Sequence, residues 1–257
     1  RRRVAYLCSG GGAARGGPNS TPPQRGGVGG EPTRLIWLNS PSNPDGRVLG
    51  IEQLRRAVER ARELGAVIVG DECYAEFGWE APWREERIPS ILDPRVVGDT
   101  HGGVLGIYSL SKQSNLAGYR AAFLAGDREL VARLLTVRKH AGLMLPAPVQ
   151  AAMTAVLADD AHVEEQRERY RARRAVLRPA LEAAGYRIEG SEAGLYLWAT
   201  GGVDAWESVA TFAELGIVVG PGHFYGAHSP EHVRFALTAS DEAIARAAVR
   251  LAGRRGA

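Results

Sequence analysis

The sequence predicts an α/β fold, with a mostly parallel sheet and its helices in the first part and a smaller α+β domain in the last part. Short apolar runs rich in β-branched residues alternate with a helical pattern early in the chain, which is typical of strand–helix–strand units. Helical patterns then dominate, and after Gly185 short strands and helices alternate again. We therefore expect a larger domain over residues 31–164 and a smaller C-terminal domain over residues 165–257.

Composition narrows the class of protein. Of 257 residues, 45% are apolar and 24% are charged, which is ordinary for a soluble globular protein. The net charge of +3 is too slight to favour a nucleic-acid partner, and no apolar run reaches the roughly 18 residues that a membrane-spanning helix needs. Cys8 and Cys73 form no disulfide framework and suit a reducing compartment, so we expect a cytoplasmic protein.

Residues 1–30 differ in character from the rest of the chain. Glycine pairs and prolines alternate with arginines, and neither a helical nor a strand period is present. We expect this segment to be irregular, either as a disordered tail or as a non-native start.

The elements after this segment follow from apolar periodicity and turn residues. A first strand is expected at residues 34–38, before the turn-rich loop Asn43-Pro44-Asp45-Gly46. A helix with an apolar stripe is expected at residues 51–64, and a buried strand at 66–69, so these two strands should be parallel. Further strands are expected at 104–108, 121–125, 186–188, 195–199, 217–219 and 232–237, and further helices at 128–141, 147–157, 161–184, 205–215 and 241–252.

A lysine lies just beyond the strand expected at residues 104–108. The chain holds 32 Lys plus Arg, but only Lys112 and Lys139 are lysines. An amine can lose its proton and form an imine with an aldehyde, whereas arginine stays charged. A lone lysine here would be a surface residue, so its significance depends on its neighbours.

Several polar side chains should share one sheet edge with this lysine, because the carboxyl ends of parallel strands face the ligand crevice of open α/β sheets. Taken singly, each of them is more often a helix cap, a packed ring, a turn residue or a surface charge. Together they supply an amine, a carboxylate, a phenol, an amide, two hydroxyls and a guanidinium. The residues are Asn43, Asp71, Tyr74, Ser109, Ser111, Lys112 and Arg120.

This combination suits pyridoxal 5′-phosphate, which pairs a lysine with an acidic partner for its pyridinium nitrogen. Asp71 would keep that nitrogen protonated, since an opposite charge favours the charged form. Tyr74 and Asn43 could hydrogen-bond the ring oxygen of the cofactor. The phosphate would be bound by the two hydroxyls and the guanidinium, which can act as a bidentate fork.

The same residues resemble the fold-type I aminotransferases of class I/II. The motifs are Asn43-Pro44-Asp45-Gly46, Asp71-x-x-Tyr74, Ser109-x-Ser111-Lys112 and Arg120, and the resemblance runs from about Arg34 to the C-terminus. The text is most similar to actinobacterial succinyldiaminopimelate aminotransferases. The matching stretches are SLSKQSNLAGYRAAFLAGD, EAGLYLWAT, PGHFYG and HVRFALTAS.

The resemblance implies a partial pyridoxal-phosphate-binding large domain and assigns roles. Lys112 would bond to the cofactor and move the proton, and Arg234, otherwise an exposed strand residue, would clamp the substrate carboxylate. The implied substrates are glutamate and a keto acid, N-succinyl-2-amino-6-oxopimelate, on the route to diaminopimelate and lysine. Family members are homodimers.

The chain also departs from this family. Members have more chain before the Asn-Pro loop, including a glycine-containing phosphate loop and an aromatic that stacks on the cofactor. Asp45 replaces a usual threonine, and His223 stands where an acidic residue is more usual. We expect an N-terminally truncated gene product, with a frameshifted start as one explanation of residues 1–30. The alternative functions are a β-lyase of the same fold and an inactive remnant that holds no cofactor.

Overall fold

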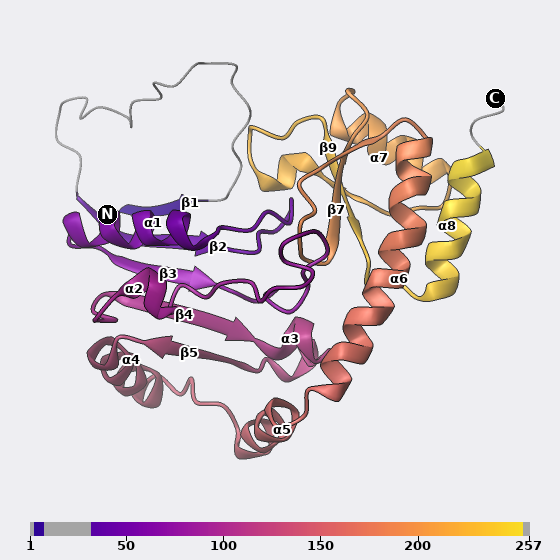
Figure 1. The fold of residues 1–257 in the computed structure, drawn as a ribbon. Coiled ribbons are helices and arrows are strands. Elements are labelled where there is room, and N and C mark those ends of the chain that lie inside the picture. Colours follow the sequence, from indigo (N-terminus) through magenta and orange to yellow (C-terminus); the bar gives the residue numbers. More distant parts are fainter. Residues whose placement is uncertain (1–2, 8–31, 254–257) are drawn as a thin grey trace.

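The computed structural model describes residues 3–7 and 32–253 and contains two sheets, with the long helix α6 running from one to the other (Figure 1). The first sheet has the order β1-β2-β3-β4-β5; its first four strands are parallel and β5 is antiparallel to β4. This confirms the predicted α/β class. The strands are β1 (Arg3–Leu7), β2 (Thr33–Asn39), β3 (Val67–Asp71), β4 (Val104–Ser109) and β5 (Ala122–Gly126).

The second sheet is antiparallel and has the order β6-β7-β9-β8. Its central strand β7 is buried at every position, because it is paired on both sides and packed against helices. The strands are β6 (Arg187–Glu189), β7 (Tyr196–Thr200), β8 (Gly220–Pro221) and β9 (His232–Ala236).

Helices connect and cover these strands. Among the described residues, no helix combines the length and apolar character that a membrane crossing requires. The helices are α1 (Ile51–Glu63), α2 (Pro94–Val97), α3 (Leu110–Gln113), α4 (Arg128–His140), α5 (Ala147–Leu157), α6 (Ala161–Ala183), α7 (Ala205–Glu214) and α8 (Asp241–Gly253), with 3-10 turns η1 (Ala117–Tyr119) and η2 (Gly222–Tyr225).

Two expectations from sequence need correction. Arg3–Leu7 is a strand and not irregular, because its backbone pairs in parallel with β2, a partner that local composition does not reveal. The rest of residues 1–30 lies outside the described residues. The strand expected at residues 217–219 is displaced to Gly220–Pro221, since pairing with β9 reaches only these two residues and Val218 is 98% exposed.

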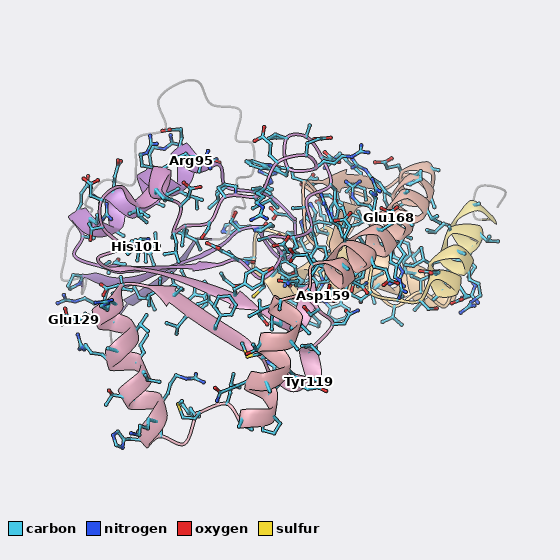
Figure 2. All side chains as sticks on the ribbon, turned by 60° about the horizontal axis from the view of Figure 1, so that its bottom comes forward. Arg95, His101, Tyr119, Glu129, Asp159 and Glu168 are labelled. Atoms are coloured by element: carbon cyan, nitrogen blue, oxygen red, sulfur yellow. The ribbon has the colours of Figure 1, made fainter. Side chains whose placement is uncertain are left out.

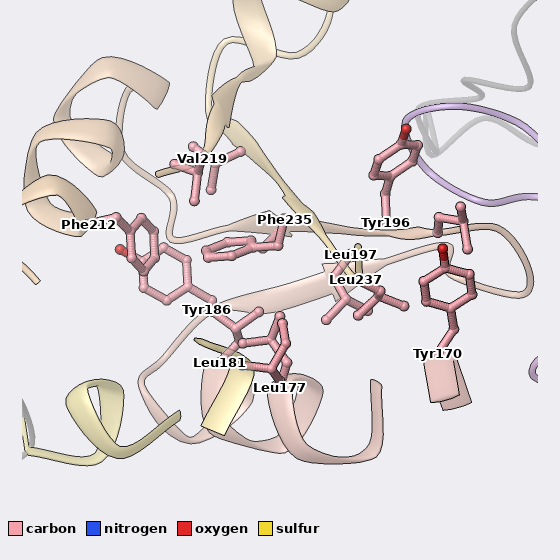
Figure 3. Close-up of a cluster of buried hydrophobic side chains, with 14 of the residues drawn as sticks. Tyr170, Leu177, Leu181, Tyr186, Tyr196, Leu197, Phe212, Val219, Phe235 and Leu237 are labelled. Atoms are coloured by element: carbon pink, nitrogen blue, oxygen red, sulfur yellow. The ribbon is translucent and has the colours of Figure 1, made fainter. Parts of the chain in front are cut away.

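The segment after β3 crosses from the first sheet into the core of the second. Phe77 is fully buried there, edge to face with Tyr170 of α6 at 5.4 Å between ring centroids and stacked on Trp79 at 6.0 Å. The neighbouring part of this core, between α6 and the second sheet, is shown in Figure 3. A piece of the larger domain thus completes the core of the smaller one, while the boundary at residue 164 stays a prediction.

Truncation of this anchor should be costly. We expect Phe77→Ala to lower the free energy of unfolding by about 3–5 kcal/mol, because it removes a buried ring and leaves a cavity. Chemical denaturation followed by circular dichroism measures the change. Phe224→Ala, at a 72% exposed phenylalanine, is the control and should change stability little. Equal losses in the two variants would contradict this account of the core.

Glu80, in the same segment after β3, forms ion pairs with two arginines of α6. Its carboxylate accepts a hydrogen bond from Arg174 at 2.7 Å and also binds Arg178, and Arg174 donates to the Ser191 carbonyl at 2.9 Å. Partial burial raises the pKa of Glu80, but the two guanidinium groups outweigh burial and hold it below its usual 4.5. The carboxylate is therefore ionised, and bound, throughout the neutral range.

This shift predicts a pH dependence of stability. Because the folded pKa is depressed, the contribution is present above the unfolded pKa and is lost as the pH falls through the folded pKa. We expect Glu80→Gln to be less stable than the parent at neutral pH, with the difference shrinking below pH 4.5. Urea denaturation across this range measures it. Glu63 is exposed and forms a surface ion pair with Arg60, so Glu63→Gln should show little difference at any pH.

Candidate functional site

The parallel register of β3 and β4 brings two of the expected site segments to one edge. Asp71 is the last residue of β3 and pairs with Ile107 of β4, two residues before that strand ends at Ser109. Lys112 follows in α3, where it is half-buried. The lysine that the sequence places just beyond the strand thus belongs to a short helix, α3.

Two serine hydroxyl groups lie at the N-terminus of this helix. The Ser109 hydroxyl accepts a hydrogen bond from the Ser111 amide at 3.2 Å, and the two hydroxyl oxygens are 2.9 Å apart. Ser109 is therefore the N-cap of α3, which satisfies an amide that the helix itself leaves free. Both predicted phosphate-binding hydroxyls lie within one turn of Lys112.

Cys73 connects Asp71 with Lys112. Its amide donates to the Asp71 carboxylate at 3.4 Å. Burial raises the pKa of the Cys73 thiol to about 12; the Asp71 carboxylate adds to this rise, and the Lys112 ammonium opposes it. The carboxylate and the amine therefore act on the same thiol, in agreement with the strand register that brings Asp71 and the Ser109–Lys112 turn to one sheet edge.

A second group of side chains reaches this region from the smaller domain. Tyr74 is buried, and its ring lies edge to face with Tyr196 at 5.9 Å. The Arg234 guanidinium lies over the Tyr196 ring at 4.0 Å and over Tyr225 at 5.2 Å. Arg234 also donates to the Asn43 side-chain oxygen at 3.0 Å.

These contacts bring three predicted residues together: Tyr74, Asn43 and Arg234. The structure adds Tyr196 and Tyr225, which our list of site residues lacked. Both lie within stretches already noted for their similarity, EAGLYLWAT and PGHFYG. Their ring contacts could not have been derived from sequence, because β7, which carries Tyr196, the 3-10 turn η2, which carries Tyr225, and β9, which carries Arg234, meet only in the folded chain.

Burial raises the pKa of Tyr74 strongly, and the neighbouring Tyr196, Cys73 and Asp71 raise it further. The phenol is therefore protonated at neutral pH and can donate a hydrogen bond. The side-chain oxygen of Asn43 accepts from Arg234, and its amide nitrogen is a hydrogen-bond donor.

Arg120 is exposed, and its guanidinium donates to the Ala117 carbonyl at 2.9 Å. The next residue, Ala121, accepts from the Leu110 amide at 3.1 Å and from the Ser109 hydroxyl at 3.4 Å. The chain therefore folds back onto α3 at this point, which puts the base of Arg120 beside the two serines. Its side chain is not bonded to them in this conformation.

The Asn43 loop is held from both sides. Asn39 accepts from the Asn43 amide at 2.8 Å and donates to the Asp71 carbonyl at 3.1 Å, which ties the loop to β3. On the other side, the Gly46 carbonyl accepts from Ala193 at 2.9 Å. Gly46 has φ +69°, and a Cβ there would lie 2.2 Å from the Ala193 carbonyl oxygen.

A cavity of about 590 Å³ lies elsewhere, between β5, α4 and α5. Its lining is mostly apolar and does not include Lys112 or Asp71. The candidate site is therefore identified by strand ends and by the chemistry of the side chains gathered there, and not by this cavity.

Taken together, an amine and a carboxylate at neighbouring strand ends of an α/β sheet supply the two side chains that a pyridoxal-phosphate-dependent transferase requires. The family model for class I and II aminotransferases matches residues 21–251, so the chain belongs to this family. Aminotransferases of this family depend on pyridoxal 5′-phosphate.

Two curated relatives with aminotransferase names are similar in sequence to this chain. The chain is 57% identical over 238 residues to the 4-dedimethylamino-4-oxo-anhydrotetracycline transaminase OxyQ of Streptomyces rimosus, covering 93% of this chain and 64% of OxyQ. It is also 57% identical over 217 residues to a probable aminotransferase of Mycobacterium tuberculosis, covering 84% of this chain and 51% of that relative. The chain therefore spans about half to two thirds of the length of these curated relatives.

Solved structures of aminotransferases superpose on this chain. An aminotransferase from Neisseria meningitidis superposes with a TM-score of 0.78 at 28% identity, covering 86% of this chain and 57% of that one. A probable N-succinyldiaminopimelate aminotransferase from Thermus thermophilus superposes with a TM-score of 0.75 at 29% identity, covering 85% and 58%.

The residues gathered at the strand ends fit the family's cofactor. An acidic side chain and an amine lie at neighbouring strand ends, two hydroxyls lie within one turn of the amine, and a protonated phenol and an amide nitrogen are present. Each group carries the donor or acceptor that the corresponding part of the cofactor requires.

Gly46 offers a test of how the Asn43 loop is held. We expect Gly46→Ala to lower the free energy of unfolding by more than about 1 kcal/mol, because alanine tolerates the positive φ poorly and its Cβ would meet a carbonyl oxygen. Gly65→Ala is the matched control: Gly65 has φ +59° with nothing within 4 Å, so only the backbone strain remains. Thermal denaturation compares the two, and a loss at Gly46 no larger than at Gly65 would contradict the packed loop.

Proposed function

We propose that this chain is the lysine-bearing part of a pyridoxal-phosphate-dependent aminotransferase, moving an amino group between an amino acid and a keto acid. The observation that carries the proposal is the parallel register of β3 and β4, which brings Asp71 and the Ser109–Lys112 turn to the same edge of the sheet. Family membership supports the reaction class. Because the chain covers only part of its relatives, the activity of the chain itself belongs to this proposal.

Each side chain has one task in this proposal. When bound, the cofactor withdraws electrons from the bonds to the substrate α-carbon. Asp71 binds the pyridinium nitrogen and keeps it charged, while Tyr74 and Asn43 donate hydrogen bonds to the ring oxygen. Lys112 would bind the cofactor covalently, and its amine, when uncharged, would accept the proton that leaves the substrate α-carbon. The remaining tasks fall to Ser109, Ser111 and Arg120 for phosphate, and to Arg234 for the substrate carboxylate.

For the substrates, we propose glutamate as amino donor and N-succinyl-2-amino-6-oxopimelate as acceptor, which places the reaction in lysine biosynthesis. The motifs quoted above and the name of the Thermus thermophilus neighbour support this acceptor. A second acceptor, a polycyclic ketone, is favoured by the 57% identity to OxyQ, whose name specifies an oxo-anhydrotetracycline. We further propose a cytoplasmic homodimer, the usual assembly of the family.

Two rival functions predict different products. A β-lyase of the same fold would release a keto acid from cystathionine and leave glutamate unchanged. An inactive remnant would keep the motifs and hold no cofactor. Incubation with glutamate and each of the two keto acceptors, and separately with cystathionine, followed by product analysis, separates these outcomes from transamination.

The direct test is an absorbance spectrum of the purified chain with added pyridoxal phosphate. We expect a band near the visible range that free cofactor does not give, lost in Lys112→Ala and kept in Lys139→Ala, since these are the only two lysines. Addition of glutamate should then shift the band. A chain that gives no such band, or that keeps it without Lys112, would refute the proposed site.

A further inference from the structure

Three side chains of α6 hold the two residues that directly follow the Lys112 helix. The His162 Nε2 lies 2.8 Å from the Ser114 hydroxyl. Asn115 donates from its amide nitrogen to Gln166 at 2.7 Å, and its amide oxygen accepts from the Tyr170 hydroxyl at 3.2 Å. We call His162, Gln166 and Tyr170 the α6 ladder.

The spacing of the α6 ladder explains why it meets one short segment. Its members are four residues apart, so they lie on one face of the helix. In Figure 1 the N-terminal half of α6 passes beside α3. We call residues 110–115, which carry Lys112, the Lys112 segment. A single helix face can therefore contact Ser114 and Asn115, two consecutive residues of this segment.

The Lys112 segment is held closely at this point. Ser114 is the C-cap of α3, and its amide donates to the Leu110 carbonyl at 3.1 Å. Asn115 has φ 53°, a left-handed conformation that asparagine tolerates better than most residues. With both ends of its side-chain amide bonded to α6, Asn115 has little freedom to release this turn.

The other end of the α6 ladder is anchored in the core of the smaller domain. Tyr170 is 3% exposed and packs edge to face on Phe77. At the opposite end, His162 Nδ1 lies 3.3 Å from the Asp159 carboxylate, which orients the ring toward Ser114. The ladder thus connects the smaller domain's core to the helix that carries Lys112.

We propose that His162, Gln166 and Tyr170 are positioning residues for Lys112. Through Ser114 and Asn115 they hold α3 against α6, so that the packing of the smaller domain sets where the Lys112 amine lies. The catalytic meaning of this position rests on the proposed function. The position itself is a property of the chain without cofactor and can be measured without it.

The lysine content of the chain makes the measurement simple. Lys112 is half-buried and Lys139 is exposed on α4, and there are no other lysines. An amine-reactive reagent, followed by peptide mass spectrometry, gives the ratio of labelling rates at the two amines. Lys139 serves as the internal reference at each pH and reagent concentration.

Gln166→Leu removes the acceptor for Asn115, and Tyr170→Phe removes only the hydroxyl that donates to it. We expect each to raise the Lys112 to Lys139 labelling ratio about fivefold, the effect of losing one ordinary hydrogen bond that holds the segment closed. Gln166→Glu keeps an acceptor oxygen and should retain most of the parent ratio. Glu165→Gln, one position along α6 at a residue paired with Arg169, should leave the ratio unchanged.

Amide exchange distinguishes positioning from general stabilisation. In Gln166→Leu and Tyr170→Phe, we expect amides of residues 110–121 to exchange about fivefold faster, with those of β7 at the parent rate. An unchanged labelling ratio in both variants overturns the proposal. Equally faster exchange in β7 also overturns it, because the α6 ladder would then be ordinary packing.

The outcome is separable from that of the proposed function. If the variants change the labelling ratio but the parent chain gives no absorbance band with pyridoxal phosphate, the positioning holds and the proposed function fails. If the band forms and the ratio does not respond, the function stands and the α6 ladder does not position the lysine.

Discussion

The parallel hydrogen bonding of β3 to β4 is the constraint on which the site depends. It aligns two strand ends that are separated by more than thirty residues of chain, so that Asp71 and the Ser109–Lys112 turn leave the sheet at the same edge. The hydrogen bonds of the sheet join backbone groups, and their register determines which side chains lie next to one another. The polar groups of the site lie at the last residue of each strand or in the residues that come directly after it.

Packing between the two domains brings the remaining residues of the candidate site to the edge of the first sheet. Phe77 and Trp79 carry the chain from β3 into the smaller domain's core, and Glu80 binds arginines of α6. The Asn43 loop is bonded to Ser191–Ala193 on one side and to β3 on the other. The consequence is that Arg234, from the second sheet, lies within hydrogen-bonding distance of Asn43, from the first.

The C-terminal part of the larger domain has a different character. In the stretch from β5 through α5, most side chains are exposed, including Leu135, Val137 and Leu143. Figure 2 shows α4 and α5 standing away from the dense packing around α6, with Glu129 on α4 at the edge of the molecule. These helices satisfy the sequence pattern, but within the described residues they have fewer partners than the rest of the fold.

Sequence alone determined the local elements and the chemical inventory. Apolar period and turn residues located α5 and the start of α6 as the structure has them, and the residues at two strand ends predicted that an amine and a carboxylate meet at one sheet edge. Tertiary structure decided the rest. Strand β1 exists because β2 offers it hydrogen bonds, and Tyr196 reaches Arg234 because β7 pairs with β9. The physical reason is that period and propensity act over a few residues, whereas pairing, ring contacts and the α6 ladder join residues that only the folded chain brings together.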